Sequence, residues 1–471
     1  MADPCSVHSK ICLVRLLLAV PLLPGLPASV AGPAIVAWSA MTQSALAQSA
    51  MTGPVRADPM QTVGAEVHVR MEALPKPYAT PAVANEAVPV PRPAGQPLKA
   101  PRGFTVTLFR DGLENARNLL VLPNGDVLVA RQRPGVLTLL RDADGDGRAE
   151  LAQSWAEGFD QPFGLAFHDG AVLVGALDGV WRLPWTPGAD RAGERRRLTP
   201  DGAFGRRGGH ATRSVAVAPD GRHFYVGIGS EGNIGVEPEP RATIQEFRID
   251  GSRQRTYAAG LRNPVGLAFK PGTGDLYTVV NERDGLGDQL VPDYLTAVAP
   301  GGFYGWPYSY IGANPQPDLA GRRPDLVKAA LVPGLLFQAH SAPLGLVFGD
   351  ATHFPERYRM GAFVALHGSW NRARPTGYAV AFVPFDNAPF DKSRPTGTYE
   401  TFVTGFRAGP DSGSDSGTGT DSGDETPRAW GRPSGLAVTA DGALLIAEDF
   451  SGSVWRVAYA AAEREPEAGK P

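Results

Sequence analysis

Polar side chains that could do chemistry stand immediately before short apolar segments at several points in the chain. Solvent-facing loops usually carry Ser, Lys and Glu, whereas these positions carry mainly Arg, Asn, Gln and His. They are Arg117, Asn118, Gln161, His210, Arg213, Arg262, Asn263, His340, Ser341 and Arg432. Arginines brought together would form a positive site that needs an anionic ligand, because arginine does not lose its charge. Individually, the same arginines could tie neighbouring segments together by hydrogen bonds.

The apolar segments that follow these residues share one pattern. A polar or small residue precedes Pro, any residue, Gly, and then three apolar or small residues. The pattern occurs at 161–167, 263–269, 342–348 and 432–438, with looser copies at 117–122 and 213–217. Asn-Gly or Asp-Gly turns follow several copies, at 123–126, 219–221 and 440–442, and lead into a second apolar segment. Such turns between apolar runs predict β-hairpins.

The spacing of the copies predicts an all-β fold. The first four lie about 50 residues apart, close to the length of a β-propeller blade, and the last two intervals contain insertions. Six copies predict a six-bladed β-propeller, whereas a β-sandwich would not repeat its hairpin six times. The inner strand of each blade runs along the central channel. The polar residues that precede the inner strands are therefore expected to gather at one mouth of this channel.

Composition agrees with many strands and turns. The 471 residues include 57 Gly and 44 Pro, which argues against a helix bundle, and 43% are hydrophobic, which argues against global disorder. The net charge of −3 gives no indication of a nucleic-acid surface. Cys5 and Cys12 are the only cysteines, so iron–sulfur clusters held by four cysteines, cysteine-rich zinc sites and a CxxCH haem attachment are excluded within this chain.

The amino terminus resembles a secretory signal. Lys10 and Arg15 precede the apolar run 16–23, and small residues allow cleavage after Ala31 or Ala47. An uncleaved membrane anchor is the alternative. Cleavage would remove both cysteines and leave a periplasmic or secreted protein without a stable membrane span. The expected organisation is a signal peptide over 1–47, a Pro/Ala-rich arm or linker over 48–100, a propeller over 101–462 with a flexible insert over 408–427, and a disordered tail over 463–471.

Three further motifs carry a resemblance to a known family. The segments 260–269 (GLRNPVGLAF), 301–307 (GGFYGWP) and 367–372 (HGSWNR) resemble the soluble glucose and sorbosone dehydrogenases. That family consists of six-bladed propellers that use pyrroloquinoline quinone (PQQ) and calcium. The resemblance covers about 103–460, and the segment 367–372 is most similar to the sorbosone-dehydrogenase-like branch.

The resemblance implies roles for single residues. His210 matches the catalytic base, although Gly209 stands where the glucose branch has an acidic residue. The residues implied in contacts with the quinone or the substrate are Gln161, Arg262, Asn263 and Arg432, with Arg372 in place of a family lysine. Calcium would be held by backbone carbonyls of Arg283 and Asp284, or by the Asp284 carboxylate.

The implied activity is oxidation of a sugar or sugar-derived aldehyde by hydride transfer to PQQ. A histidine suits proton removal from the substrate hydroxyl, and an external quinone or cytochrome must accept the electrons, because this chain has no haem motif. The alternatives are a calcium-dependent lactonase or esterase on the same fold, disfavoured by a rim expected to be richer in Arg than in Asp or Glu, and a non-catalytic propeller that binds a glycan or a protein.

The sequence allows two interpretations for several other residues. The segment Asp142 to Asp146 resembles the start of an EF-hand loop, but Gln153 stands where the bidentate Glu belongs, so it is a hairpin turn or an accessory calcium loop. His367 lies beside the channel or packs within a blade. Trp306 and Trp370 pack between strands or stack on a sugar.

Overall fold

The structure, a computed structural model, describes residues 58–95, 97–408 and 426–460. These residues belong to one of the two compact units into which the chain divides, Val55–Pro471. The expected signal peptide 1–47, all but the ends of the expected insert 408–427, and the tail 463–471 lie outside the described residues.

Six antiparallel sheets of four or five strands dominate the described part of the chain. The first contains β4 (Ala116–Val121), β5 (Val127–Arg131), β6 (Val136–Arg141) and β7 (Leu151–Ala156). The second contains β8 (Gly164–His168), β9 (Ala171–Ala176), β10 (Gly179–Pro184) and β11 (Arg196–Arg197). The third contains β12 (Val215–Val217), β13 (His223–Ile228), β14 (Thr243–Arg248) and β15 (Arg255–Ala259).

In the other three sheets, the fourth has an insertion before its last strand, and the fifth and sixth each take one strand from an earlier part of the chain. The fourth contains β16 (Pro264–Phe269), β17 (Leu276–Val280), β18 (Pro292–Ala297) and β21 (Leu335–Ala339). The fifth contains β22 (Pro343–Phe348), β23 (Gly361–Leu366), β24 (Ala379–Pro384), β25 (Tyr399–Val403) and β1 (Glu66–Val67). The sixth contains β28 (Pro433–Val438), β29 (Leu444–Glu448), β30 (Ser453–Tyr459) and β3 (Phe104–Arg110).

The predicted hairpins are confirmed. The turn 123–126 joins β4 to β5 in antiparallel register, with Val121 opposite Val127. The turns 219–221 and 440–442 join β12 to β13 and β28 to β29 in the same way.

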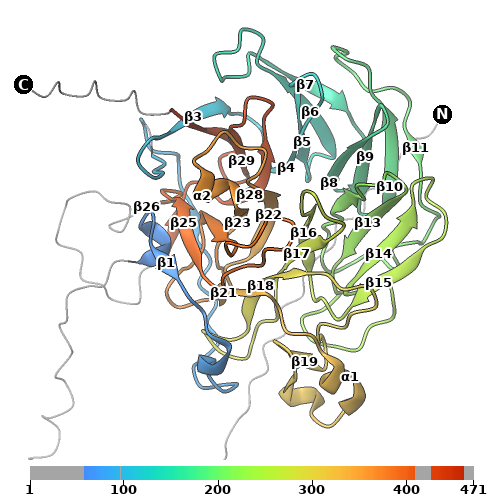
Figure 1. The fold of residues 1–471 in the computed structure, drawn as a ribbon, viewed down its shortest axis with the longest axis vertical. Coiled ribbons are helices and arrows are strands. Elements are labelled where there is room, and N and C mark those ends of the chain that lie inside the picture. The colour runs from blue at the N-terminus through green and yellow to red at the C-terminus, as the bar shows by residue number, and fades with distance from the viewer. Residues whose placement is uncertain (1–57, 96, 409–425, 461–471) are drawn as a thin grey trace, which may run out of the picture. The chain divides into compact units, whose positions relative to one another are not determined.

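The sheets are arranged around a central channel, as in a β-propeller. They follow one another around the centre from β4–β7 through β13–β15 to β28–β30 (Figure 1). The first strand of each sheet is innermost, and each of these strands contacts the next, from β4 through β8, β12, β16 and β22 to β28. Strand β28 contacts β4 in turn, so the ring is closed.

Close approach of the inner strands explains the glycine of the repeat. A Cβ built on Gly266 would lie 2.8 Å from the carbonyl oxygen of Leu344, and one on Gly345 would lie 2.7 Å from that of Ser434. On Gly435 it would lie 2.6 Å from Cα of Asn118, in the first sheet. Any side chain at these positions would push two neighbouring sheets apart.

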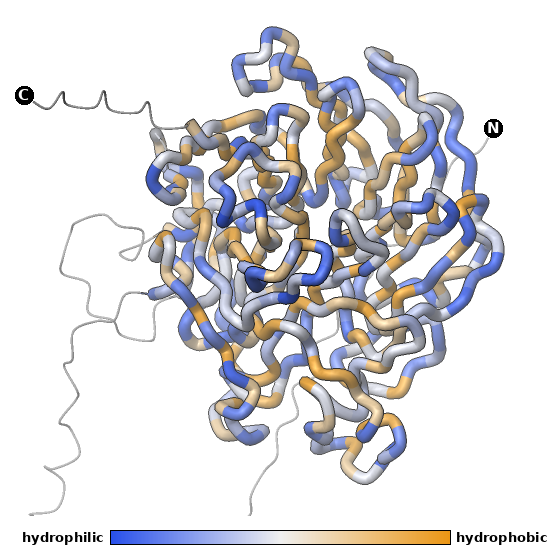
Figure 2. Tube along the Cα trace, in the orientation of Figure 1, coloured by the Kyte–Doolittle hydropathy of each residue, from blue (hydrophilic) through white to orange (hydrophobic). Residues whose placement is uncertain are grey.

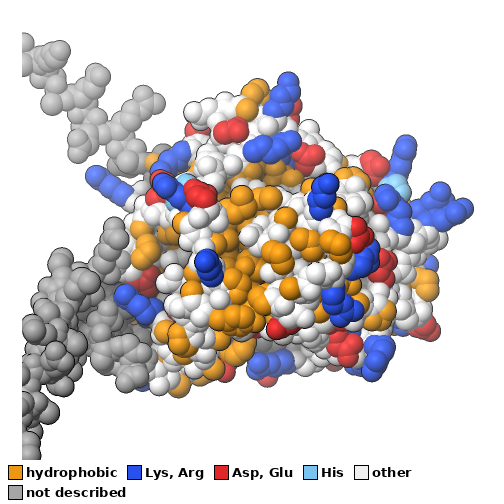
Figure 3. All heavy atoms as spheres, turned by 90° about the horizontal axis from the view of Figure 1, so that it is seen from below, with side chains coloured by type: hydrophobic (Ala, Val, Ile, Leu, Met, Phe, Trp, Pro, Cys, Tyr) orange, Lys and Arg blue, Asp and Glu red, His pale blue; other side chains and the backbone are white. Residues whose placement is uncertain are grey.

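The hydrophobic core lies between neighbouring sheets. Trp155 and Leu139 of the first sheet pack with Val174 and Leu183 of the second in one buried cluster. Figure 2 shows the hydrophobic residues along the strands and the hydrophilic ones in the outer loops. Figure 3 shows hydrophobic side chains gathered in the middle of one face, with Lys and Arg around its edge.

The arm that precedes the ring packs against it. Strand β3 pairs with β30 and joins the two ends of the ring, and β1 pairs with β25. Asn85 donates its backbone N–H to the Trp370 carbonyl at 2.7 Å and its side-chain amide to the Ala373 carbonyl at 3.1 Å. Asn85 is thereby held by the connection between β23 and β24.

The remaining elements are short. Two small sheets contain β19 (Ser309–Tyr310) with β20 (Asn314–Pro315), and β2 (Val88–Pro89) with β27 (Arg428–Ala429) and β26 (Arg407–Ala408). The helices are η1 (Pro59–Gln61), η2 (Met71–Ala73), η3 (Pro317–Leu319), α1 (Pro324–Ala329) and α2 (Glu356–Arg359). Within the described ranges, no helix has the length and hydrophobicity to cross a membrane.

Candidate active site

A polar cavity of about 450 Å³ lies at the mouth of the channel where the inner strands begin. Its walls come from Arg117, Gln132, His210, Ala211, Thr212, Arg262, Asn263, Asn281, Glu282, Asp284, Asp293, His340, Ala342, Leu344, His367, Trp370, Asn371 and Arg432. Six of the residues that the repeat placed at the mouth are among them: Arg117, His210, Arg262, Asn263, His340 and Arg432. The other four are not: Asn118, Gln161, Arg213 and Ser341.

A second group of lining residues follows the second strand of a sheet. Gln132 comes directly after β5, His367 directly after β23, and Glu282 two residues after β17. Since the first two strands of each sheet are antiparallel, the end of the second lies beside the start of the first. Pro343 is opposite Leu366, for example, and Pro264 is opposite Val280.

His210 is oriented by a backbone carbonyl. Its Nδ1 lies 2.8 Å from the carbonyl oxygen of Ser230, which can only accept, so Nδ1 carries the proton and Nε2 is the unprotonated nitrogen. Burial and the positive charge of Arg262 lower the pKa of His210 to about 4. The Ser230 carbonyl thus does what the carboxylate absent at Gly209 would do: it fixes the ring and the tautomer.

His367 forms a second, differently paired imidazole in the cavity wall. Its Nε2 lies 2.9 Å from Oδ1 of Asp449, and the other carboxylate oxygen of Asp449 accepts from Arg117 at 2.6 Å. Burial and the nearby Arg432 lower the pKa of His367 to about 4. Burial acts to raise the pKa of Asp449, but His367 and Arg117 together lower it below its usual range.

Carboxylates and a third histidine line the side of the cavity near β17. Oδ1 of Asp284 accepts from the Asn371 amide at 2.6 Å and lies 3.5 Å from Nδ1 of His340, while its Oδ2 lies 3.7 Å from Arg262. Oε2 of Glu282 is bonded to Arg283, but its buried Oε1 has no hydrogen-bond partner among the described residues.

Asp293 connects the loop after β17 to the start of β22. Its two carboxylate oxygens accept the backbone N–H groups of Glu282 at 2.8 Å and Ala342 at 2.7 Å. Burial raises the pKa of Asp293 to about 7. Three carboxylates therefore line the cavity beside three arginines, so the expected excess of Arg over Asp and Glu together is not present.

Arg262 and Arg432 both face the cavity and anchor neighbouring loops. Arg262 donates to the Glu282 carbonyl at 2.8 Å and to the Asn233 side-chain oxygen at 3.0 Å. Arg432 donates to the carbonyls of His367 and Gly368. Burial lowers the pKa of each guanidinium. The expectation that such arginines tie segments together thus holds for both, and each still presents its charge to the cavity.

Three residues implied by the resemblance do not line the cavity. Gln161 is exposed, with a φ of 50° directly before Pro162 and the start of β8. The Arg372 guanidinium turns toward the Ala339 carbonyl, 3.0 Å away, and toward Asp288. Arg283 is fully buried behind the wall, where its guanidinium is held by Glu282 and by the Ser309 carbonyl.

The two tryptophans, Trp306 and Trp370, differ in their position relative to the cavity. Trp306 is buried and donates its indole N–H to the Asn233 carbonyl at 3.0 Å, so it packs in the wall. Trp370 lines the cavity and is 46% exposed.

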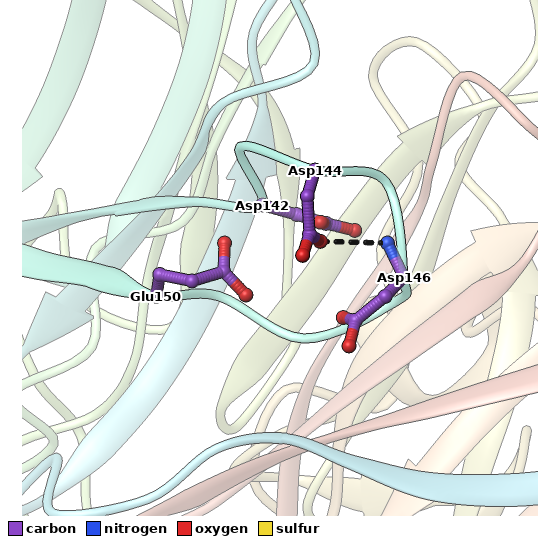
Figure 4. Close-up of side chains that lie close together, drawn as sticks. All are labelled: Asp142, Asp144, Asp146 and Glu150. Atoms are coloured by element: carbon purple, nitrogen blue, oxygen red, sulfur yellow. Dashed lines mark hydrogen bonds between the residues drawn. The ribbon is translucent and has the colours of Figure 1, made fainter.

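The acidic loop after β6 lies apart from this cavity. Carboxylate oxygens of Asp142, Asp144, Asp146 and Glu150 approach within 4.8 Å of one another (Figure 4). Oδ1 and Oδ2 of Asp142 accept the backbone N–H groups of Gly145 and Gly147 at 2.8 and 2.9 Å. The segment is a turn between β6 and β7, and Glu150 stands at the ninth position of the EF-hand spacing, which is also a ligand position.

The opposite end of the channel contains a cavity of about 370 Å³ whose side chains are mostly apolar. Its walls include Leu119, Leu165, Val215, Leu267, Leu346 and Leu436, the equivalent apolar positions of the six copies. Leu344 lines both cavities and packs with Phe163 and Val265. This small cluster separates the polar end from the apolar end.

Comparison with known proteins agrees with this architecture. A 26% identical relative, the pyrroloquinoline quinone-dependent pyranose dehydrogenase of Coprinopsis cinerea, aligns with 78% of this chain, and an uncharacterized protein of Borreliella burgdorferi is 30% identical over 53% of it. The chain spans only 55% and 61% of the lengths of these two relatives.

Solved structures share the fold. The PQQ domain of the Coprinopsis cinerea pyranose dehydrogenase superposes with a TM-score of 0.64 and 24% identity, covering 78% of this chain and 98% of that domain. A Trichoderma reesei protein of carbohydrate-active enzyme family AA12 gives a TM-score of 0.62 and 20% identity, covering 77% and 98%. The family model described as TrAA12-like matches residues 98–296 and 327–460. Since these segments make up most of the chain, the protein belongs to the TrAA12-like family.

Proposed function

We propose that this protein is a quinoprotein oxidoreductase that oxidises a pyranose or a sugar-derived aldehyde and passes the electrons to an external acceptor. The observation that carries the proposal is one cavity with three arginines and a histidine whose Nε2 is free to accept a proton. The named activity of the Coprinopsis cinerea relative supports it. The sorbosone-type substrate, suggested by residues 367–372, is the narrower form of the proposal.

The residues of the cavity fit PQQ. Its carboxylates require cations, and Arg117, Arg262 and Arg432 supply them, with Nε of Arg117 buried and without a hydrogen-bond partner among the described residues. Asn263 adds a neutral donor to the same wall. These four residues would hold the cofactor.

The wall beside Arg262 fits a calcium ion. Calcium takes oxygen ligands, and the unpartnered Oε1 of Glu282 lies in the same wall as the Asp284 carboxylate. These two residues would hold the ion, in place of the Arg283 carbonyl suggested by the resemblance. When bound, the quinone supplies an electrophilic carbon that accepts hydride, and calcium polarises it.

The role of His210 follows from its geometry. Nε2 would take the proton of the substrate hydroxyl, while the Ser230 carbonyl keeps the ring in place. The low pKa of His210 keeps it unprotonated at neutral pH. An anionic ligand beside Arg262 would offset part of the positive charge and raise the pKa of His210 toward the operating pH.

A calcium-dependent hydrolase is the second candidate, because Glu282, Asp284 and Asp293 bring three carboxylates to the wall. One experiment distinguishes the oxidoreductase from the hydrolase. Purified protein is mixed with PQQ and calcium, and its absorbance is scanned before and after addition of pyranoses. The oxidoreductase predicts saturable quinone uptake and a reduced-quinone spectrum with sugar. Lactone hydrolysis without quinone uptake would favour the hydrolase.

Two further proposals concern the whole molecule. We infer that the six sheets are the six blades of the propeller, which the closed contact ring supports. We infer export to the periplasm or the medium, which the apolar run 16–23 supports. Mass analysis of the mature amino terminus tests export: a chain that begins at Gly32 or Gln48 is expected, and recovery of intact Met1 outside the cytoplasm would contradict it.

A further inference from the structure

A second cavity adjoins the candidate active site and has a volume of about 680 Å³. Four side chains line both cavities and form the partition between them: Arg117, Gln132, His367 and Arg432. The other walls are Glu86, Ala87, Val88 and Pro89 from the arm, and Asn115, Arg133, Asp449 and Phe450 from the first and sixth sheets. None of these outer walls belongs to the first cavity.

The partition contains unsatisfied hydrogen-bond donors. Gln132 is only 9% exposed, and its amide nitrogen Nε2 has no partner among the described residues. Nε of Arg117 is unpartnered in the same way. Buried donors are almost always paired in folded proteins, so the unpaired donors of residues that line both cavities are expected to bond to what fills them.

The lining chemistry selects the class of ligand. Arg117 is paired with Asp449 at 2.6 Å, whereas Arg432 donates to backbone carbonyls and keeps its charge. Glu86 and Arg133 add one exposed charge of each sign. Phe450 adds an aromatic ring to these polar groups. Many hydrogen-bonding groups around one aromatic surface suit a neutral ring that has hydroxyl groups and an apolar face, as a glycosyl unit does.

We propose that the second cavity is a subsite for the neighbouring glycosyl unit of a disaccharide or longer oligosaccharide, with the amide of Gln132 donating to the sugar at the partition. The inference rests on the proposed function, in which the terminal unit reacts beside His210. Its consequence is a preference for substrates longer than one sugar ring.

The test measures binding without turnover. The full mature chain, with no quinone added, is titrated calorimetrically with matched pairs of sugars: glucose with cellobiose, galactose with β-1,4-galactobiose, and mannose with β-1,4-mannobiose. In at least one pair the disaccharide is expected to bind about tenfold tighter. In the variant Gln132→Leu, the disaccharide and the monosaccharide of that pair should bind with nearly equal affinity. The control variant Gln153→Leu, on β7 with its amide bonded to Asp190, should keep the wild-type difference.

The stability of the variant distinguishes a binding role from a structural one. Because Gln132→Leu removes an unpaired buried amide, its unfolding free energy is expected to equal or exceed that of the wild type. Equal affinity for both members of every pair, or an unchanged ratio in Gln132→Leu, would overturn the subsite. Failure of the quinone-loaded enzyme to oxidise any sugar would instead count against the proposed function, and the calorimetric comparison would still stand.

Discussion

The two ends of the channel are built by the same strands but are lined by different kinds of side chain. At one end the equivalent positions of the repeat are apolar, such as Leu119, Leu267 and Leu436, and they line a cavity without paired charged side chains. At the other end the residues before the same strands differ from sheet to sheet, and they line a polar cavity with charged walls. The constant part of the repeat therefore builds the ring, whereas the variable positions at its polar mouth build the site.

The largest expected effect belongs to the polar end. Replacing His210 by Gln should lower saturated turnover of the PQQ-loaded enzyme by about 10²–10⁴-fold, because the proton acceptor is lost while the fold is kept. Turnover is measured with an artificial dye acceptor. His223→Gln, on β13 and outside the cavity, is the matched control and should retain normal turnover. Full turnover in His210→Gln would show that this histidine is structural.

At the apolar end the expected effect is on stability alone. Leu436 is 4% exposed and belongs to the large core cluster between the fifth and sixth sheets. Leu436→Ala should lower the unfolding free energy by about 2–5 kcal/mol, as measured by denaturant titration, and leave turnover per folded molecule unchanged. A large loss of turnover in the folded variant would mean that the two ends are coupled.

A further effect should appear in the pH dependence of stability. His210 and His367 have native pKa values of about 4, against an ordinary value of 6.5, so the unfolded chain binds more protons than the native one between these limits. Stability should therefore rise as the pH increases from 4 to 6.5, by up to about 1.4 kcal/mol per pH unit for each histidine.

The variant His367→Gln should show a shallower slope in urea unfolding across this range, and His68→Gln, in the exposed arm, should show the wild-type slope. An unchanged slope in His367→Gln would mean that this histidine is not held neutral in the folded protein.

Local signals in the sequence predict part of the fold and part of the cavity. The hairpins were predictable because Asn-Gly and Asp-Gly turns and apolar strands are local signals, as at 123–126. His210, Arg262 and Arg432 were predictable as cavity residues because their places follow from the strand that each precedes. Gln161 was predicted in the cavity for the same reason. Its backbone has a positive φ just before β8, however, and its side chain is exposed to solvent.

Other cavity residues were missed for a geometric reason. Gln132 and Glu282 follow second strands, which the repeat did not mark, although antiparallel pairing brings their ends to the same mouth. A search for polar residues just after each second strand would have found them, together with Asp449 directly after β29. The arm residues 86–89 could not have been placed, because no local pattern says on which sheet an irregular segment packs.

The central claim is that the polar mouth binds an anionic quinone, and a titration of Arg262→Ala tests it most directly. Wild type, Arg262→Ala and Leu436→Ala, each confirmed as folded, are titrated with PQQ in excess calcium and followed by absorbance. The account predicts saturable binding in the wild type and in Leu436→Ala, and a loss of about 2–4 kcal/mol of binding free energy in Arg262→Ala, since a buried charge-assisted pair is removed. Equal affinity in all three proteins, or no binding to the wild type at micromolar quinone, would contradict it.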